Sequence, residues 1–218
     1  MDVFNAIVKF FQEGGMFMYP IMLVFALGAA IAIERYVYLS VAKQKNRSIW
    51  NKLTPLVKAN NYKQAMELSS RSKSEVGKIL SYGLSRLQVT KHRDDIEIAM
   101  EEGLMEVIPR LEKRTHYLAT FANIATLLGL LGTIIGLIQA FTAVANANPA
   151  DKADLLSASI SVAMNTTAFG LVAAIPLLLM FTVLQTKTTE IVDSMEMATV
   201  KFLNSITEYA KESSRKVD

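Results

Sequence analysis

The chain has 218 residues, of which 51% are hydrophobic, and its mean hydropathy is +0.28, a composition that indicates a membrane protein rather than a soluble domain. The net charge of +3 does not indicate a nucleic-acid-binding protein, because acidic residues are interleaved with the basic ones along the middle of the chain. With no cysteine and only two histidines, disulfides and thiolate chemistry are excluded, and a histidine-based metal site is not expected.

The first half of the chain predicts one membrane span between two helical regions. Residues 1–15 carry bulky apolar side chains on one helical face, which predicts a short helix in the outer, periplasmic membrane interface. The uncharged run over residues 14–33 predicts a transmembrane helix over residues 16–39, with Glu34 and Arg35 near its cytoplasmic end. Residues 40–115 carry many charges with apolar positions at helical spacing, which predicts a cytoplasmic helical region. Its last helix is expected to run into the next span without a loop, and Pro109 is a candidate kink.

The second half predicts two more spans. Uncharged stretches predict transmembrane helices over residues 116–144 and 155–186, joined by a periplasmic loop over 145–154. Residues 187–218 resume an amphipathic pattern and predict a cytoplasmic C-terminal helix. The expected fold class is therefore an all-α membrane protein with three transmembrane helices and long cytoplasmic helical extensions.

The distribution of lysine and arginine predicts the orientation of the chain. These residues concentrate between the first and second spans, whereas the loop before the third span carries only Lys152. The positive-inside rule then places the middle region and the C-terminus in the cytoplasm and the N-terminus in the periplasm.

The third span is unusual because it has no ionisable residue yet is rich in polar ones. Ser161 and Asn165 are four residues apart, and Thr166 and Thr167 follow directly. Polar groups in hydrocarbon are costly unless they pair with one another or line a hydrated path. We therefore expect these four residues, with Thr133 on the second span, to line an ion pathway. Hydroxyls and amides do not titrate near neutral pH, so a partner chain would have to supply a carboxylate.

Small residues on the same spans predict close helix packing. Gly129, Gly132 and Gly136 recur at three- and four-residue spacing on the second span, and Gly170 lies on the third. Pro176 is a candidate kink in the third span. For a threonine, the alternative to pore lining is a hydrogen bond to a carbonyl of its own helix. No catalytic triad, phosphate-binding loop or dinucleotide motif is found, and the chain is not expected to be an enzyme.

Three sequence blocks carry a resemblance to a known family. Residues 14–20, 126–141 and 166–176 are similar to the three span signatures of the MotA/TolQ/ExbB proton channel family, and the likeness is greater to its TolQ/ExbB branch than to the flagellar stators. The resemblance implies a homopentamer around two copies of an ExbD-like single-span subunit whose transmembrane aspartate carries the coupling ion. It also implies a TonB-like partner, a bacterial inner membrane location, and H⁺ or Na⁺ as the coupling ion with no cofactor. Thr133 and Thr167 match the family's pore-facing threonines.

One departure from the family pattern concerns the coupling ion. ExbB and TolQ proteins commonly carry a glutamate at the position that is Val162 here, five residues before Thr167. An Asn and Thr lining without that acid resembles sodium-driven stators. The expected function is an ExbB-like pore subunit that drives TonB-dependent outer-membrane transport. A sodium-driven motor subunit of the same superfamily and a non-conducting membrane scaffold remain the alternatives.

Overall fold

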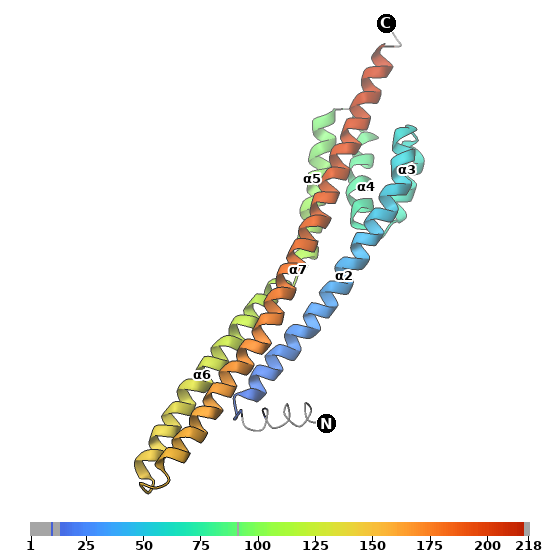
Figure 1. Ribbon diagram of the computed structural model, residues 1–218. Coiled ribbons are helices and arrows are strands. Elements are labelled where there is room, and N and C mark those ends of the chain that lie inside the picture. Colours follow the sequence, from blue (N-terminus) through green and yellow to red (C-terminus); the bar gives the residue numbers. More distant parts are fainter. Residues whose placement is uncertain (1–9, 11–13, 91, 216–218) are drawn as a thin grey trace, which may run out of the picture. The chain divides into compact units, whose positions relative to one another are not determined.

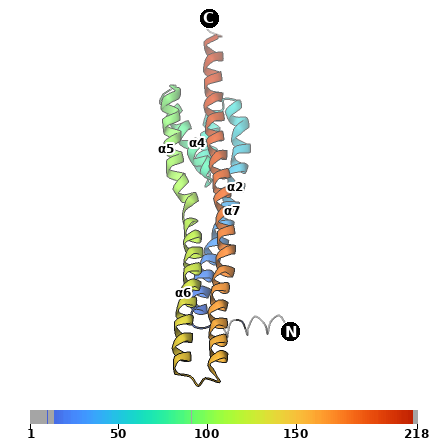
Figure 2. The same cartoon turned by 60° about the vertical axis from the view of Figure 1, so that its left-hand side comes forward.

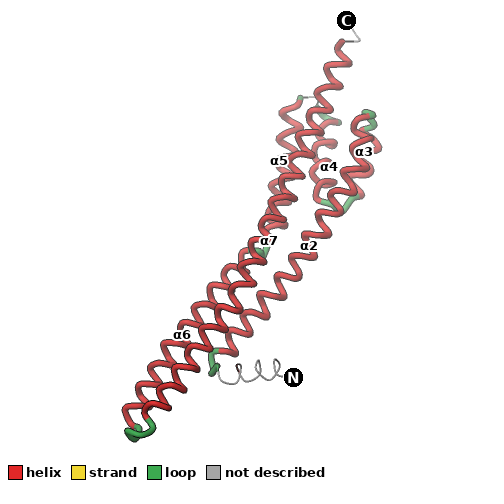
Figure 3. Tube along the Cα trace, in the orientation of Figure 1, coloured by secondary structure: helices red, strands yellow, loops and turns green. Residues whose placement is uncertain are grey.

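The computed structural model describes residues 10, 14–90 and 92–215, and every element in them is an α-helix (Figures 1 and 3). The predicted interfacial helix over residues 1–15 lies almost entirely outside the described residues. The helices, in chain order, are α2 (Met18–Lys58), α3 (Tyr62–Arg71), α4 (Glu75–Leu87), α5 (Arg93–Glu112), α6 (His116–Asn146) and α7 (Lys152–Arg215).

Three helical segments are long and apolar enough to cross a membrane. They lie in α2, in the α5–α6 stretch and in α7, which confirms the expected class of an all-α protein with three membrane-spanning helices. Each of these segments is apolar because it contains a long uncharged run, and a bilayer requires roughly 20 such residues.

The expectation that α5 runs directly into the second span is wrong. The helix α5 ends at Glu112 and α6 begins at His116, with a turn over residues 113–115. Arg114 has a φ of 66°, and this left-handed conformation cannot continue a right-handed helix. Pro109 lies inside α5, so the break falls in the turn that follows and not at the proline.

The chain forms two compact units, and the helices α2 and α7 contribute to both. The first unit combines residues up to Arg35 with Arg114–Val183, and the second combines Tyr36–Lys113 with residues from Leu184 onward. In the first unit, α6 and α7 are consecutive helices that lie side by side (Figures 1 and 2). Residues 147–151 join them, so the two helices run antiparallel.

The second unit packs α3, α4 and α5 with the charged halves of α2 and α7. Gly83 on α4 lets the neighbouring helices approach, since a Cβ on it would lie 2.7 Å from Met100 and 3.1 Å from Phe202. Asn46 on α2 is buried, and its Oδ1 accepts a hydrogen bond of 3.1 Å from the backbone N–H of Val76. That amide is one of the unpaired donors at the start of α4, so Asn46 fastens α4 to α2.

Polar contacts also join α2 to α7 within the second unit. Lys43 and Glu190 form an exposed ion pair of 2.6 Å. The ammonium of Lys187 donates to the Ser40 hydroxyl at 2.6 Å and lies 3.9 Å from the centre of the Tyr36 ring.

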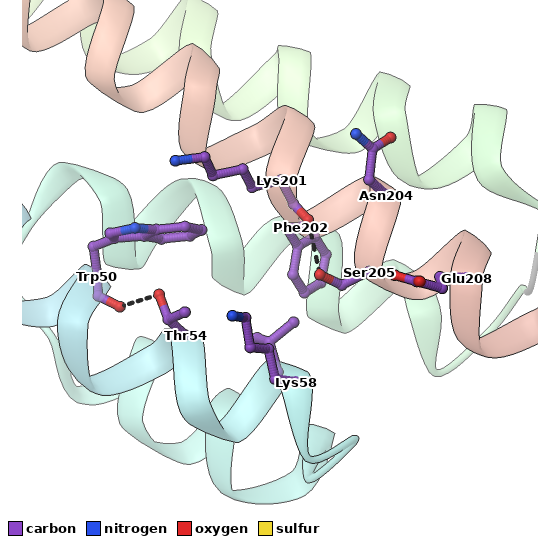
Figure 4. Close-up of a pocket in the computed structure, with 9 residues that line it drawn as sticks. Trp50, Thr54, Lys58, Lys201, Phe202, Asn204, Ser205 and Glu208 are labelled. Carbon is purple, nitrogen blue, oxygen red and sulfur yellow. Dashed lines mark hydrogen bonds between the residues drawn. The ribbon is translucent and has the colours of Figure 1, made fainter.

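The same unit has an open groove between α2 and α7, with a volume of about 370 Å³ (Figure 4). Trp50, Thr54 and Lys58 line it from α2, and Lys201 and Glu208 are among the residues that line it from α7. The hydroxyl of Thr54 is already bonded to the Trp50 carbonyl of its own helix.

Candidate functional site

Glycines bring the backbones of α6 and α7 into close contact within the first unit. A Cβ placed on Gly170 would lie 2.8 Å from the Ala125 carbonyl oxygen and 3.0 Å from the Gly129 Cα. Similarly, a Cβ on Gly136 would lie 2.9 Å from the Cβ of Ala163. Only glycine permits this approach, and it places side chains of one helix within reach of the carbonyls of the other.

Thr133 and Thr167 meet at this contact. Their hydroxyls hydrogen-bond to each other across the two helices. Thr167 Oγ1 also lies 2.9 Å from the Gly129 carbonyl oxygen on α6, and Thr133 Oγ1 lies 3.5 Å from the Ala163 carbonyl oxygen on α7. Thr133 can donate within its own helix as well, to Gly129 at 3.2 Å.

The contact is thus a cluster of four oxygens, two from hydroxyls and two from main-chain carbonyls. We call these atoms the threonine cluster: Thr133 Oγ1, Thr167 Oγ1, and the carbonyl oxygens of Gly129 and Ala163. Each hydroxyl has one hydrogen to donate, so not all of these hydrogen bonds form at once, and oxygen lone pairs remain available. Such oxygens can bind water or replace part of the hydration shell of a cation. They do not titrate near neutral pH.

Thr166 is adjacent to Thr167 but faces a different part of the unit. Successive residues of a helix are rotated by about 100°. The side chain of Thr166 is only 2% exposed, and its hydroxyl lies 2.6 Å from the Gly14 carbonyl oxygen and 2.9 Å from the Val162 carbonyl oxygen. Its methyl group packs on α6, 2.4 Å from where a Cβ of Gly132 would be.

Ser161 and Asn165 lie on a third face of α7. Asn165 is two residues from Thr167, which places it on nearly the opposite side of the helix. Ser161 is exposed and Asn165 is half-buried, and neither side chain makes a hydrogen bond within the part of the chain that the structure describes. The structure therefore brings Thr133 and Thr167 together and leaves the other three predicted residues apart from them.

Acidic residues are absent from the threonine cluster. Among the described residues, no group of three or more His, Cys, Asp or Glu side chains could hold a metal ion. Val162 is half-buried, and its Cγ1 lies 3.1 Å from where a Cβ of Gly15 would be. Val162 therefore packs against the turn before α2.

Several groups at this site could not be identified from the sequence. The carbonyls of Gly129, Ala163 and Gly14 are main-chain atoms, and their participation depends on which helices meet. The ring of Phe10 lies 6.4 Å from that of Phe169 in an edge-on arrangement, a contact between residues far apart in the chain. Pro176, in contrast, is a candidate kink from the sequence; it lies inside α7, where it provides no N–H for the carbonyl of Val172.

Comparison with known proteins identifies related chains. The sequence model of the MotA/TolQ/ExbB proton channel family matches residues 71–197, more than half of the chain. A putative biopolymer transport protein ExbB homolog of Methanothermobacter thermautotrophicus is 26% identical over 199 residues, which cover 90% of this chain and 69% of that protein. The biopolymer transport protein exbB1 of Vibrio cholerae is 27% identical over 168 residues, 76% of this chain and 73% of that protein. The Tol-Pal system protein TolQ of Haemophilus influenzae is 38% identical over 78 residues, 36% of this chain and 34% of that protein.

Proposed function

Because this chain belongs to the MotA/TolQ/ExbB proton channel family, we propose that it is the ExbB-like pore subunit of an ion-driven motor in a bacterial inner membrane. The family consists of channel and transport subunits and is not a family of enzymes. In the proposed motor, ion flow produces motion that a TonB-like protein transmits to outer-membrane transport. Relatives named as ExbB and TolQ proteins support this assignment.

The observation that carries the proposal is the threonine cluster. It lies in the contact between two membrane-spanning helices, and it offers oxygen atoms without a titratable group. These oxygens solvate an ion as it passes but are not titratable carriers of a proton near neutral pH. The proposed complex therefore needs a carboxylate from another chain, and the transmembrane aspartate of an ExbD-like subunit would supply it. Five copies of this chain would surround two copies of that subunit.

The other predicted residues take different proposed roles. Thr166 is bonded to Gly14 and belongs to helix packing, as do Gly129, Gly132, Gly136 and Gly170, which all lie in the α6–α7 contact. Ser161 and Asn165 lie on a face of α7 that is open within this chain, and they would contact a neighbouring subunit or the partner helix.

Valine substitutions test the proposal, because valine keeps the shape of threonine and removes its hydroxyl. We expect Thr133→Val and Thr167→Val each to reduce ion flux at least tenfold in proteoliposomes that contain the chain and its ExbD-like partner. The oligomer should assemble normally. Thr126→Val is the matched control, because Thr126 is half-buried on the same helix and donates only to Ala122 of that helix. Unchanged flux in both cluster variants would favour a non-conducting scaffold.

A sodium-driven motor is the second candidate, and the chemistry of the cluster favours it. Hydroxyl and carbonyl oxygens are ligands for a hard cation, and Val162 replaces the acid that is common in the family. Activity measured under an imposed sodium gradient and under an imposed proton gradient distinguishes the two candidates. Full activity in the absence of sodium would exclude sodium coupling.

A further inference from the structure

The turn before α2 docks along one face of α7. Three residues of that face, at positions i, i+4 and i+7, form a stripe that consists of Val162, Thr166 and Phe169. We call the residues opposite them the N-terminal turn: Gly14 and Gly15, where the turn begins, together with the preceding helical residue Phe10. Each stripe residue has a counterpart in the turn: Phe10 contacts Phe169, Gly14 accepts from Thr166, and Gly15 packs on Val162.

Glycine shapes both positions of the turn: Gly15 adopts its backbone conformation next to Val162, and Gly14 leaves room for the side chain of Met18. Gly15 has a φ of +75°, a conformation that other residues rarely adopt. Gly14 is buried, and a Cβ on it would lie 1.8 Å from the terminal carbon of Met18. The backbone of the turn can therefore present the Gly14 carbonyl directly to the Thr166 hydroxyl.

Thr166 lies where three segments meet. Its hydroxyl reaches the N-terminal turn, its methyl group packs against Gly132 of α6, and its backbone belongs to α7. The next residue, Thr167, points to Gly129 and Thr133. Any rotation of α7 about its axis that moves Thr167 away from Thr133 must also move Thr166 relative to the Gly14 carbonyl.

We propose that Thr166 is a positioning residue for the threonine cluster. By hydrogen-bonding the N-terminal turn, it restrains the rotation of α7 and holds the Thr167 hydroxyl against Thr133. The single hydroxyl hydrogen has two acceptors, at 2.6 Å in Gly14 and at 2.9 Å in Val162 of its own helix. Donation to Gly14 couples the turn to α7, and donation to Val162 releases it. This inference rests on the proposed function, because it assigns to Thr166 an effect on how the cluster binds an ion.

The first experiment measures docking of the turn, and the absence of cysteine from the chain makes it direct. Cysteines replace Phe10 and Phe169 in the full chain and are joined with a short thiol-specific cross-linker; the ring contact is then missing equally from every background, so differences in yield report the Thr166 hydrogen bond. We expect efficient cross-linking that falls at least threefold when Thr166→Val is added and is unchanged when Thr126→Val is added. Equal yields in all three backgrounds would overturn the proposal.

The second experiment measures the ion dependence of flux. We expect Thr166→Val to shift the half-saturating ion concentration at least threefold, with the oligomer intact, and Thr166→Ser to restore it because serine keeps the hydroxyl. Wild-type ion dependence in Thr166→Val, or a serine variant as impaired as valine, would overturn the proposal. Should Thr166→Val not fold, Phe169→Leu loosens the same docking and is expected to shift the half-saturating concentration in the same direction. An unshifted half-saturating ion concentration in Phe169→Leu would then overturn the proposal.

The two proposals fail separately. If Thr133→Val and Thr167→Val leave flux unchanged, the proposed function is wrong. If those variants abolish flux while Thr166→Val keeps the wild-type ion dependence, only the positioning role is wrong.

Discussion

At the scale of single residues, the direction of each side chain determines what a polar group can do. Thr166 and Thr167 are neighbours of the same type, yet one hydroxyl meets the main chain of the N-terminal turn and the other meets α6. A rotation of about 100° between successive residues is enough to give them different surroundings. The two threonines therefore have different proposed roles, although their side chains are chemically identical.

The ion pair between Lys43 and Glu190 predicts a pH dependence that can be measured. The hydrogen bond from Lys43, and next its positive charge, lower the pKa of Glu190 below its ordinary value of 4.5. The folded state then binds fewer protons than the unfolded state, so the contribution of the pair is present above the ordinary pKa and is lost as the pH falls through the folded pKa. We expect wild type to unfold at a higher temperature than Glu190→Gln at pH 7, and the difference to vanish in acid.

Salt and a second variant control this measurement. The pair is exposed, with about half of each side chain accessible, so added salt should also reduce the difference. Glu196→Gln changes an exposed residue on the same helix and should leave the unfolding temperature at pH 7 unchanged. A difference between wild type and Glu190→Gln that persists in acid would contradict the assignment.

At the scale of helices, glycines determine how closely two helices can pack, because glycine has no side chain. In the contact between α6 and α7, Gly129 and Gly170 face backbone atoms, whereas Gly28 on α2 faces the flexible end of the Leu177 side chain. Backbone atoms cannot move without shifting a whole helix, but a leucine side chain can change rotamer. The same substitution should therefore have different consequences at the two places.

Gly170→Ala and Gly28→Ala test this difference. Alanine favours helix formation over glycine by about 1 kcal/mol, so without a packing conflict both variants would be as stable as wild type or more so. At position 170 the added methyl lies 2.8 Å from the Ala125 carbonyl oxygen. We therefore expect Gly170→Ala to destabilise the chain by about 1–3 kcal/mol, measured by unfolding in detergent. Equal stability of the two variants would show that the glycine contact is not tight.

At the scale of the whole molecule, most of the membrane-spanning surface is not covered by the chain itself. Only 22%, 22% and 28% of the three apolar segments is buried within the chain. Large apolar residues on α6, such as Leu127, Ile134 and Phe141, are more than half exposed. Lipid or further subunits must cover this surface in a membrane, and the proposed homopentamer would cover part of it.

The orientation of the chain can be tested in intact cells. The charge distribution predicts that the loop between α6 and α7 is periplasmic and that α4 is cytoplasmic. In the cysteine-free chain, Asn148→Cys should react with a membrane-impermeant maleimide that reaches the periplasm. Ser85→Cys, at an exposed position of α4, should react only after the inner membrane is permeabilised. The reverse labelling pattern would invert the proposed topology.

The sequence by itself determined the class of this protein. Long uncharged runs require helices in a bilayer, because only internal hydrogen bonding satisfies the backbone there, and these runs are sufficient to predict the three membrane-spanning helices. Local patterns also predicted that the glycines allow close helix packing, and they identified both threonines of the cluster as candidate site residues. The tertiary structure alone decided that Thr133 meets Thr167 and that Thr166 meets Gly14, because these contacts involve carbonyls of other segments. It also located the break at Arg114, where a left-handed backbone conformation interrupts a pattern that side-chain spacing left continuous.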